Sequence, residues 1–308
     1  MRKRPIEETN YTLEYSKFTF DDDVGNSAFG RAHQLDLKPD LPQSTNELIG
    51  VDLTHIIHVN DVAAAKGGGA GGGGGGGGGT TSFPSYTSGL PGGYNITIEF
   101  KGTWNQANYD VFVAAANKLS QLIIGDLADV TVYGGKGGPK VVDDILITAE
   151  LGNIDGVGNV LGQAGPTALR TANSLPATAT MKFDLADVGT MTSTEFGYVV
   201  LHEMAHSLGF GSIWSRLGLV TNGYFTGENA TGEFGGLIPV EQDGGSGTAG
   251  SHWDEATFGN ELLTGYLNDG ENLFSEMSAA SFADLGYVLA ANYGGVTDAY
   301  VYPDAVVA

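Results

Sequence analysis

The chain has 308 residues and a formal net charge of −22, from 14 basic and 36 acidic residues. This balance argues against a nucleic-acid partner, because phosphate binding needs clustered Lys and Arg. Cysteine is absent, which excludes disulfides and thiolate ligands, so any metal must be bound by His, Asp or Glu. No apolar run approaches the roughly 18 residues of an integral membrane span, and no signal peptide is visible after the basic start.

A glycine run divides the chain into two unequal parts. Between Gly67 and Gly79 there are 12 glycines, interrupted by Ala70, which predicts a flexible linker over residues 67–82. Residues 1–66 contain strand-like patterns at Tyr11–Phe20 and Leu53–Val59. A small β module, a pro-segment and an anchoring piece all remain open for this segment.

The part after the linker begins with a strand, because Tyr94–Phe100 alternates apolar and polar residues. Asn105 to about Gly125 is predicted to be a helix, since its apolar residues recur at helical spacing. Further strands are predicted at Asp129–Tyr133, Asp144–Ala149, Val160–Ala164 and Ala179–Phe183.

The clearest helix of the chain follows these strands. Thr192 to Glu195 forms a capping box, and apolar positions continue to Gly209, where a left-handed residue ends the helix. Gly211–Gly250 is expected to be loop-like, and shorter helices are predicted at Ala256–Leu263 and Ser278–Leu285. Strands mixed with a few helices indicate an α+β fold with a mixed sheet.

This helix contains the sequence His202-Glu203-Met204-Ala205-His206. Two histidines four residues apart project from one face and can bind a single ion, while Glu203 is placed to hold a metal-bound water. Zn²⁺ lowers the pKa of such a water and polarises a carbonyl, and a carboxylate takes the proton. A metal-free surface helix would also account for the three residues, but this helix is apolar on nearly every side, which makes unpartnered ionisable groups costly.

The segment from His202 to Gly211 resembles the zinc helix of the metzincin metalloproteases. The wider similarity is to leishmanolysin-like proteins and covers roughly Tyr94 to Tyr287. It implies a zincin-like catalytic domain with a mixed twisted sheet, an active-site helix and a smaller C-terminal subdomain. Residues 83–210 would form the upper subdomain, and residues 211–308 would form the lower one.

The resemblance also assigns roles around the site. It implies that Gly209 ends the zinc helix, that Met277 belongs to the methionine turn beneath the metal, and that Val160–Pro166 is the substrate-binding edge strand with Met181–Asp184 beside it. The absence of cysteine departs from the disulfide-rich members of the family and excludes latency through a thiolate on zinc. If residues 1–66 inhibit the enzyme, they must do so with a carboxylate or by steric blockage.

The third zinc ligand is expected to be His252. In the metzincins that this segment resembles, the third histidine follows the helix at a short spacing. In this chain Ser212 occupies that position, and serine is a poor zinc ligand. His252 is the remaining histidine after His206, and loop closure over the intervening residues grows only logarithmically with length. The glycines of Asn222–Gly236 argue against a second helix that would carry a glutamate ligand. The competing carboxylates are Glu228, Glu233, Glu241, Asp243, Asp254 and Glu255.

The sequence therefore predicts an extracellular or cell-surface zinc endopeptidase acting on proteins or peptides. Glu203 would be the general base, and the substrate would add as a strand near Val160–Ala164. The alternatives are an inactive metzincin-fold adhesion or binding module, and a different zinc hydrolase with a downstream Glu as third ligand.

Several other candidates carry weaker signals. His33, His55 and His58 are interpreted as ordinary structural histidines. Asp155–Asn159 could supply oxygens to Ca²⁺, but a plain turn is favoured because the spacing of an EF-hand is missing. Tyr266 and Tyr287 are candidates for stabilising an oxyanion, and buried aromatic packing explains both equally well.

Overall fold

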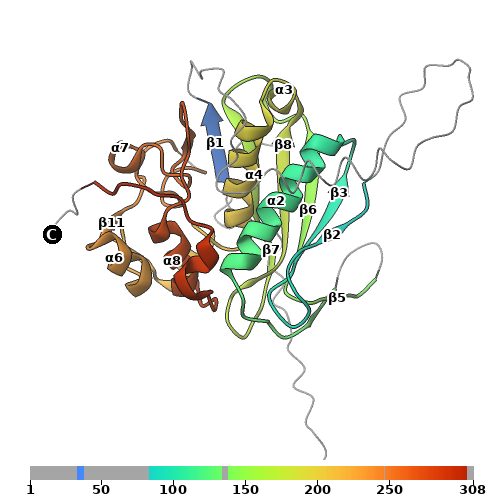
Figure 1. Ribbon diagram of the computed structural model, residues 1–308, viewed down its shortest axis with the longest axis horizontal. Coiled ribbons are helices and arrows are strands. Elements are labelled where there is room, and N and C mark those ends of the chain that lie inside the picture. Colours follow the sequence, from blue (N-terminus) through green and yellow to red (C-terminus); the bar gives the residue numbers. More distant parts are fainter. Residues whose placement is uncertain (1–32, 38–82, 134–137, 246, 304–308) are drawn as a thin grey trace, which may run out of the picture.

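The computed structural model describes residues 33–37, 83–133, 138–245 and 247–303. Its centre is a seven-stranded mixed sheet with the strand order β12-β1-β7-β8-β6-β3-β2 (Figure 1). These strands are β1 (His33–Leu37), β2 (Tyr86–Thr87), β3 (Ile96–Lys101), β6 (Ile145–Gly152), β7 (Val160–Leu169), β8 (Pro176–Asp184) and β12 (Tyr266–Leu267). A separate hairpin is formed by β4 (Val130–Val132) and β5 (Lys140–Val142). The predicted α+β class with a mixed sheet is confirmed.

The main sheet combines parallel and antiparallel strand pairs. β3, β6 and β8 run parallel to one another, whereas β7 is antiparallel to β8. β1 is antiparallel to β7 and parallel to β12. The predicted strand at Val160–Ala164 is the first half of a longer strand. In the structure β7 is an inner strand, because β1 pairs with its outer side, so the edge strand that the resemblance implied at Val160–Pro166 is not found there.

Two long helices cover one face of this sheet (Figure 1). α2 (Gln106–Leu122) starts at Asn105, whose side chain accepts a hydrogen bond from the backbone N–H of Asn108. α4 (Ser193–Ser207) starts with the predicted capping box, in which Thr192 and Glu195 each accept the other's backbone N–H. α4 packs against α2, β7 and β8, which buries all of its residues from Phe196 to Ser207. A short helix α3 (Leu185–Val188) connects β8 to α4.

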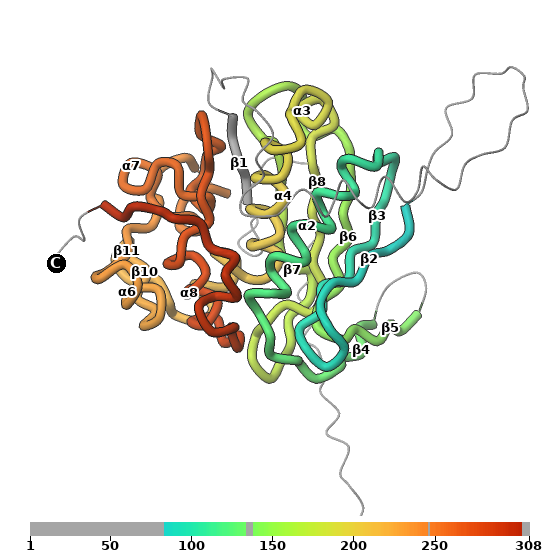
Figure 2. Tube along the Cα trace, in the orientation of Figure 1, coloured from blue at the N-terminus to red at the C-terminus, as the bar shows by residue number. Residues whose placement is uncertain are grey.

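The chain after α4 folds into short elements at one side of the sheet, coloured orange to red in Figure 2. They are α5 (Trp214–Leu217), β9 (Val220–Thr221), β10 (Tyr224–Phe225), α6 (Glu228–Phe234), β11 (Ile238–Pro239), α7 (Glu255–Phe258), α8 (Glu276–Leu285) and a 3₁₀ helix over Ala291–Gly295. The expectation of a loop over Gly211–Gly250 is wrong, because that stretch forms two helices and a three-stranded sheet. The helix expected at Ala256–Leu263 is confined to α7, since Gly259 leaves the helical conformation.

One continuous hydrophobic core joins the sheet side to this later region. Phe112 and Phe183 on the sheet side and Phe210, Trp253 and Phe282 on the other side belong to the same buried cluster. The division at residue 210 into upper and lower subdomains therefore remains a prediction. The strands expected at Tyr11–Phe20 and Leu53–Val59 and the glycine linker lie outside the described residues.

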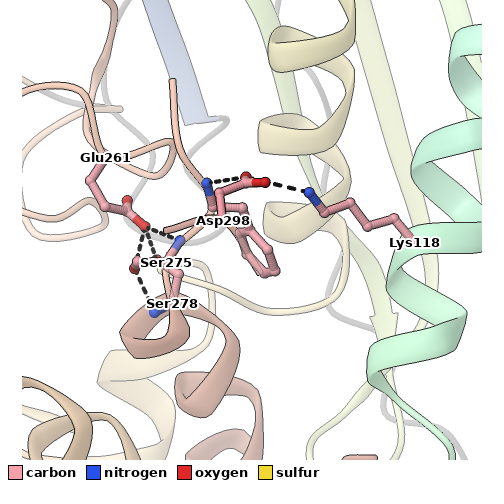
Figure 3. A network of polar contacts seen from close by, with 6 residues as sticks. Lys118, Glu261, Ser275, Ser278 and Asp298 are labelled. Carbon is pink, nitrogen blue, oxygen red and sulfur yellow. Dashed lines mark hydrogen bonds and ion pairs between the residues drawn. The ribbon is translucent and has the colours of Figure 1, made fainter. Parts of the chain in front are cut away.

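A buried polar network crosses between the two sides (Figure 3). Lys118 of α2 forms an ion pair at 3.5 Å with Asp298, whose carboxylate also accepts the backbone N–H of Phe274. In the same view, Glu261 accepts hydrogen bonds from Ser275 and Ser278 at the start of α8. These contacts fix the later region against α2 without a disulfide.

Candidate metal centre

Helix α4 brings His202 and His206 together by its own periodicity. Their Nε2 atoms are 2.9 Å apart, as expected for side chains one turn apart on the same face. Both side chains are fully buried, like the rest of the helix around them. The helix ends just beyond them, because Gly209 has a φ of 111°, and a Cβ there would meet Ile213 at 2.8 Å.

His252 reaches the same point from a distant part of the chain. Its Nε2 atom lies 3.2 Å from that of His202 and 3.0 Å from that of His206. Backbone hydrogen bonds from Glu241 to His252 and from Trp253 to Leu263 anchor the segment that carries it. The structure therefore brings together the three histidines that the sequence predicted.

The orientation of the three rings is fixed by backbone carbonyl groups. The Nδ1 atoms of His202, His206 and His252 lie 2.8, 2.9 and 2.9 Å from the carbonyl oxygens of Leu262, Phe210 and Thr248, respectively. A carbonyl oxygen only accepts, so each Nδ1 carries the proton and each Nε2 presents a lone pair. Three lone pairs thus converge, and no proton is shared among them.

This donor set fits a zinc ion. Burial lowers the pKa of His202 to about 3, with a further contribution from His252, and lowers the pKa of His252 to about 4, so these imidazoles are neutral. Converging lone pairs about 3 Å apart repel one another unless a cation lies between them. With Zn–N distances of about 2.05 Å, a tetrahedral site needs nitrogens roughly 3.3 Å apart, which is close to the observed separations. Carbonyl groups on the distal nitrogens are the usual outer partners of zinc-binding histidines.

Glu203 lies beside this centre in an unusual environment. Its side chain is fully buried, and within the described part of the chain neither carboxylate oxygen has a hydrogen-bond partner. Burial raises the pKa of this carboxyl well above its usual value. The backbone of Gly162 on β7 packs directly against it, because a Cβ at that position would lie 2.9 Å from Oε1. β7 and the carboxylate are therefore immediate neighbours.

Two residues outside the histidine cluster, Glu261 and Gly211, hold the later region in place, and neither was predicted from the sequence. The buried carboxylate of Glu261 accepts the backbone N–H of Leu263 at 2.6 Å and the hydroxyl of Ser275 at 2.7 Å. This fixes the turn whose Leu262 carbonyl orients His202. Gly211 is equally important, since a Cβ there would meet the carbonyl oxygen of Ser251 at 2.0 Å. Neither role has a local sequence signal, because each depends on residues far away in the chain.

Aromatic side chains surround the segment that carries His252. Trp253 packs against Phe210, Trp214 and Phe225 with ring centroids 4.9 to 5.3 Å apart. Its indole N–H donates to Ser278 on α8 at 2.8 Å. These contacts fix the Trp253 side chain, and they thereby hold in place the backbone of His252, the preceding residue.

The remaining predicted site residues are placed as follows. Ser212 donates its hydroxyl to the carbonyl of His206, so it caps the zinc helix. Met277 is buried as the second residue of α8, within a helix, and its place in a methionine turn stays a prediction. The Tyr287 hydroxyl donates to the carbonyl of Leu208 at 2.9 Å, which ties it to the end of α4. Tyr266 lies on β12 beside β1.

The competing carboxylates have other contacts or lie on the surface. Glu233 accepts from Tyr293, and Asp254 caps α7 through the N–H of Thr257. Glu241 accepts the backbone N–H groups of Asp243 and Glu255. Glu228 and Asp243 are exposed. The argument that glycines prevent a helix around Glu228 and Glu233 is wrong, because both residues lie in α6.

Comparison with known proteins points in one direction. The leishmanolysin family model matches residues 233–301, a stretch that includes His252 but not the zinc helix. A leishmanolysin homolog from Crithidia fasciculata is 29% identical over 152 residues, which are 40% of this chain and 21% of that protein. The chain thus spans about a fifth of the length of this relative. The resemblance to leishmanolysin is confirmed.

In the described part of the chain, no helix is both long enough and apolar enough to cross a bilayer.

Proposed function

We propose that the protein is a zinc-dependent endopeptidase in which His202, His206 and His252 hold the metal. The observation that carries this proposal is the convergence of three Nε2 lone pairs, each oriented by a backbone carbonyl. When bound, zinc supplies an acidified water and a Lewis acid for the peptide carbonyl.

Glu203 acts as the general base. Its carboxylate is buried next to the histidine cluster, neither oxygen has a hydrogen-bond partner among the described residues, and burial raises its pKa. It takes a proton from the attacking water and delivers that proton to the amine leaving group. Glu203 does not bind the metal, because it points from the helix about 100° away from the two histidines.

The substrate adds to the edge of β7. An extended peptide on this edge gains backbone hydrogen bonds by β-augmentation, with little dependence on its side chains. Gly162 brings this edge directly against Glu203, so a peptide bond paired there lies within reach of the base. An extracellular or cell-surface location completes the proposal, which the acidic composition and the absence of cysteine support.

The test is cleavage of a quenched-fluorescence peptide library by the zinc-loaded protein, with and without 1,10-phenanthroline. Glu203→Ala should keep close to one zinc per chain while lowering turnover by several orders of magnitude. Loss of zinc together with activity in this variant would contradict the role of Glu203 as a base that does not bind the metal. Persistent inactivity of the pure, zinc-loaded protein, including a variant in which β1 no longer pairs with β7, would instead favour a binding module with a metal.

A further inference from the structure

Three aspartates meet where β6 passes into β7. Asp155 lies in the connecting loop, Asp184 is the last residue of β8, and Asp187 lies in α3. One carboxylate oxygen from each lies within 4.8 Å of the other two. Within the described residues, no Lys or Arg forms an ion pair with any of them.

Asp184 shapes this loop through backbone hydrogen bonds. Its Oδ2 atom accepts from the N–H groups of Ile154, Asp155 and Gly156 at 2.5, 3.0 and 3.2 Å, and its Oδ1 atom accepts from Ala186. Burial alone would raise the pKa of Asp184, but these four donors hold it below the usual value. Asp184 is thus ionised and keeps the loop folded over the other two carboxylates.

Asp187 supplies the observation that points to a ligand. The side chain is fully buried, and its Oδ1 atom accepts the N–H of Gly158 at 2.7 Å. Its Oδ2 atom is buried with no hydrogen-bond partner in the described part of the chain. A buried carboxylate oxygen without a partner is costly, and the neighbouring Asp155 and Asp184 add repulsion.

We propose that Asp155, Asp184 and Asp187 form a Ca²⁺ site. Ca²⁺ takes 6–8 oxygen ligands at about 2.3–2.6 Å, so one ion can contact oxygens that are up to about 5 Å apart. The donors are oxygens alone, which disfavours zinc, and Ca²⁺ accepts an irregular set of oxygens more readily than Mg²⁺, which demands octahedral geometry. The sequence favoured a plain turn at Asp155–Asn159 because Asp184 and Asp187 are remote in the chain.

The experiment is thermal unfolding of the full chain after removal of all metals and addition of one equivalent of zinc. Ca²⁺ at about 100 times its Kd should raise Tm by about 5 °C or more, and Mg²⁺ should not. Asp187→Asn should abolish this rise, while Asp269→Asn, an exposed aspartate elsewhere, should retain it. Asp155→Asn serves as a second variant, since an exposed side chain is not needed for folding.

Absence of a Ca²⁺-dependent rise in the wild type would overturn the proposal. A full rise in both Asp187→Asn and Asp155→Asn would overturn it as well, because the ion would then bind elsewhere. An equal rise with Mg²⁺ would refute the choice of Ca²⁺. Since zinc is present at one equivalent in every sample, the result does not depend on the proposed peptidase activity.

A different observation concerns the strand from the N-terminal segment. β1 lies between β7 and β12, pairing Leu35 with Gly162 on one side and Asp36 with Tyr266 on the other (Figure 1). Gly162 is the residue that packs against Glu203. Residues 33–37 therefore occupy the edge of β7 that the proposed function gives to the substrate.

The metal centre is closed in this arrangement. His202, Glu203, His206 and His252 are all fully buried, so a peptide reaches them only if a covering segment leaves. In the sequence, β1 is separated from β2 by a stretch with 12 glycines between Gly67 and Gly79, a composition typical of linkers. Its two neighbours in the sheet, β7 and β12, both belong to the part of the chain after residue 83.

The geometry points to residues 33–37 as an internal occupant of the peptide site, which keeps the peptidase inactive until it is displaced. This inference rests on the proposed function. β1 pairs with β7 in the antiparallel direction, as a peptide bound by β-augmentation can. Residues 33–37 therefore compete with a peptide for the same backbone groups of β7.

Leu35→Pro in the full chain tests this, because proline lacks an N–H and breaks strand pairing. Amide exchange at residues 162–164 should become faster, and peptide cleavage should rise about 10-fold or more at unchanged zinc content. Leu13→Pro, in the same segment but outside β1, should change neither. Unchanged exchange and unchanged cleavage in Leu35→Pro would overturn the inference. Faster exchange in Leu35→Pro, without cleavage by any zinc-loaded variant, would support the pairing of residues 33–37 with β7 but contradict the proposed peptidase activity.

Discussion

The two sides of the metal centre are built in different ways. On the sheet side, α4 supplies His202, Glu203 and His206 from one regular helix with a capping box at its start. On the other side, His252 comes from a stretch without regular structure, held by Trp253, Glu261 and close backbone contacts. Helical periodicity alone places the first set, whereas the second depends on tertiary contacts.

This difference explains where the site is robust and where it is vulnerable. The backbone hydrogen bonds of α4 are internal to its own segment, so the positions of His202 and His206 relative to each other do not depend on distant residues. The His252 segment instead depends on single contacts that span large sequence distances, such as that between Gly211 and Ser251. Variants on the two sides should therefore fail differently.

The largest effect is expected for the third ligand. His252→Ala should abolish cleavage and lower zinc affinity at least about 10-fold, because two imidazoles alone remain on the metal. Zinc affinity is measured by competition with a chromophoric chelator, and activity with a quenched peptide. Glu228→Ala and Glu233→Ala should leave both nearly unchanged. An essential glutamate together with a dispensable His252 would contradict the three-histidine site.

Gly211→Ala should strongly destabilise the protein. Its φ of 65° disfavours a side chain by about 1–2 kcal/mol, and the added Cβ would lie 2.0 Å from the carbonyl oxygen of Ser251. We expect a loss of at least about 3 kcal/mol in the free energy of unfolding, measured in urea, with weaker zinc binding.

Gly218→Ala is the matched control for this substitution. Gly218 has a φ of 69°, but an added Cβ would meet no atom within 4 Å. It should therefore cost only about 1–2 kcal/mol and leave zinc binding intact. Equal losses in the two variants would show that backbone conformation, and not the close approach to Ser251, explains the effect.

The sheet side could largely be predicted from the sequence. The alternation at Tyr94–Phe100, the apolar stripe of α2 and the capping box of α4 are local signals, and β3, α2 and α4 formed where those signals lie. The two helical ligands followed from their spacing alone. β7 and β8 extend beyond the predicted strands, because Pro166 in β7 and Pro176 in β8 obscured the pattern.

The later region could not be predicted in the same way, since its elements are stabilised from a distance. The first turn of α6 is capped by Asp284, whose carboxylate accepts the backbone N–H groups of Asn229 and Ala230 from 55 and 54 residues away. Gly227 lets this carboxylate approach, because a Cβ there would lie 2.4 Å from it. A local reading of glycine as a helix breaker therefore gave a loop. That His252 lies beside His202 and His206 was nevertheless predicted, from its residue type and not from the fold around it.

A smaller effect is expected for Glu261→Gln. An amide retains one acceptor but directs N–H groups toward Leu263, Ser275 or Ser278, which already donate to this side chain. We expect a loss of about 1–3 kcal/mol in stability and a several-fold weaker zinc affinity, because the Leu262 carbonyl that orients His202 shifts.

Glu276→Gln provides the comparison, since Glu276 is exposed in the first turn of α8. It should change zinc affinity little. If Glu261→Gln lowers stability but leaves zinc affinity at the wild-type value, then Glu261 stabilises the later region without positioning the ligand.

The smallest effect concerns the ion pair between the two sides. Burial lowers the pKa of Lys118 to about 8, although Asp298 opposes the shift, while an unfolded lysine has a pKa of about 10.4. Between these values the unfolded chain binds more protons, so this residue makes stability rise with pH, by at most about 1.4 kcal/mol per pH unit. Lys118→Met should flatten that rise between about pH 8 and pH 10 in urea unfolding measured at several pH values.

An exposed lysine, Lys101, gives the control, because Lys101→Met should keep the slope. A wild-type slope in Lys118→Met would mean that other groups titrate in this range and that the buried lysine is not the source of the pH dependence.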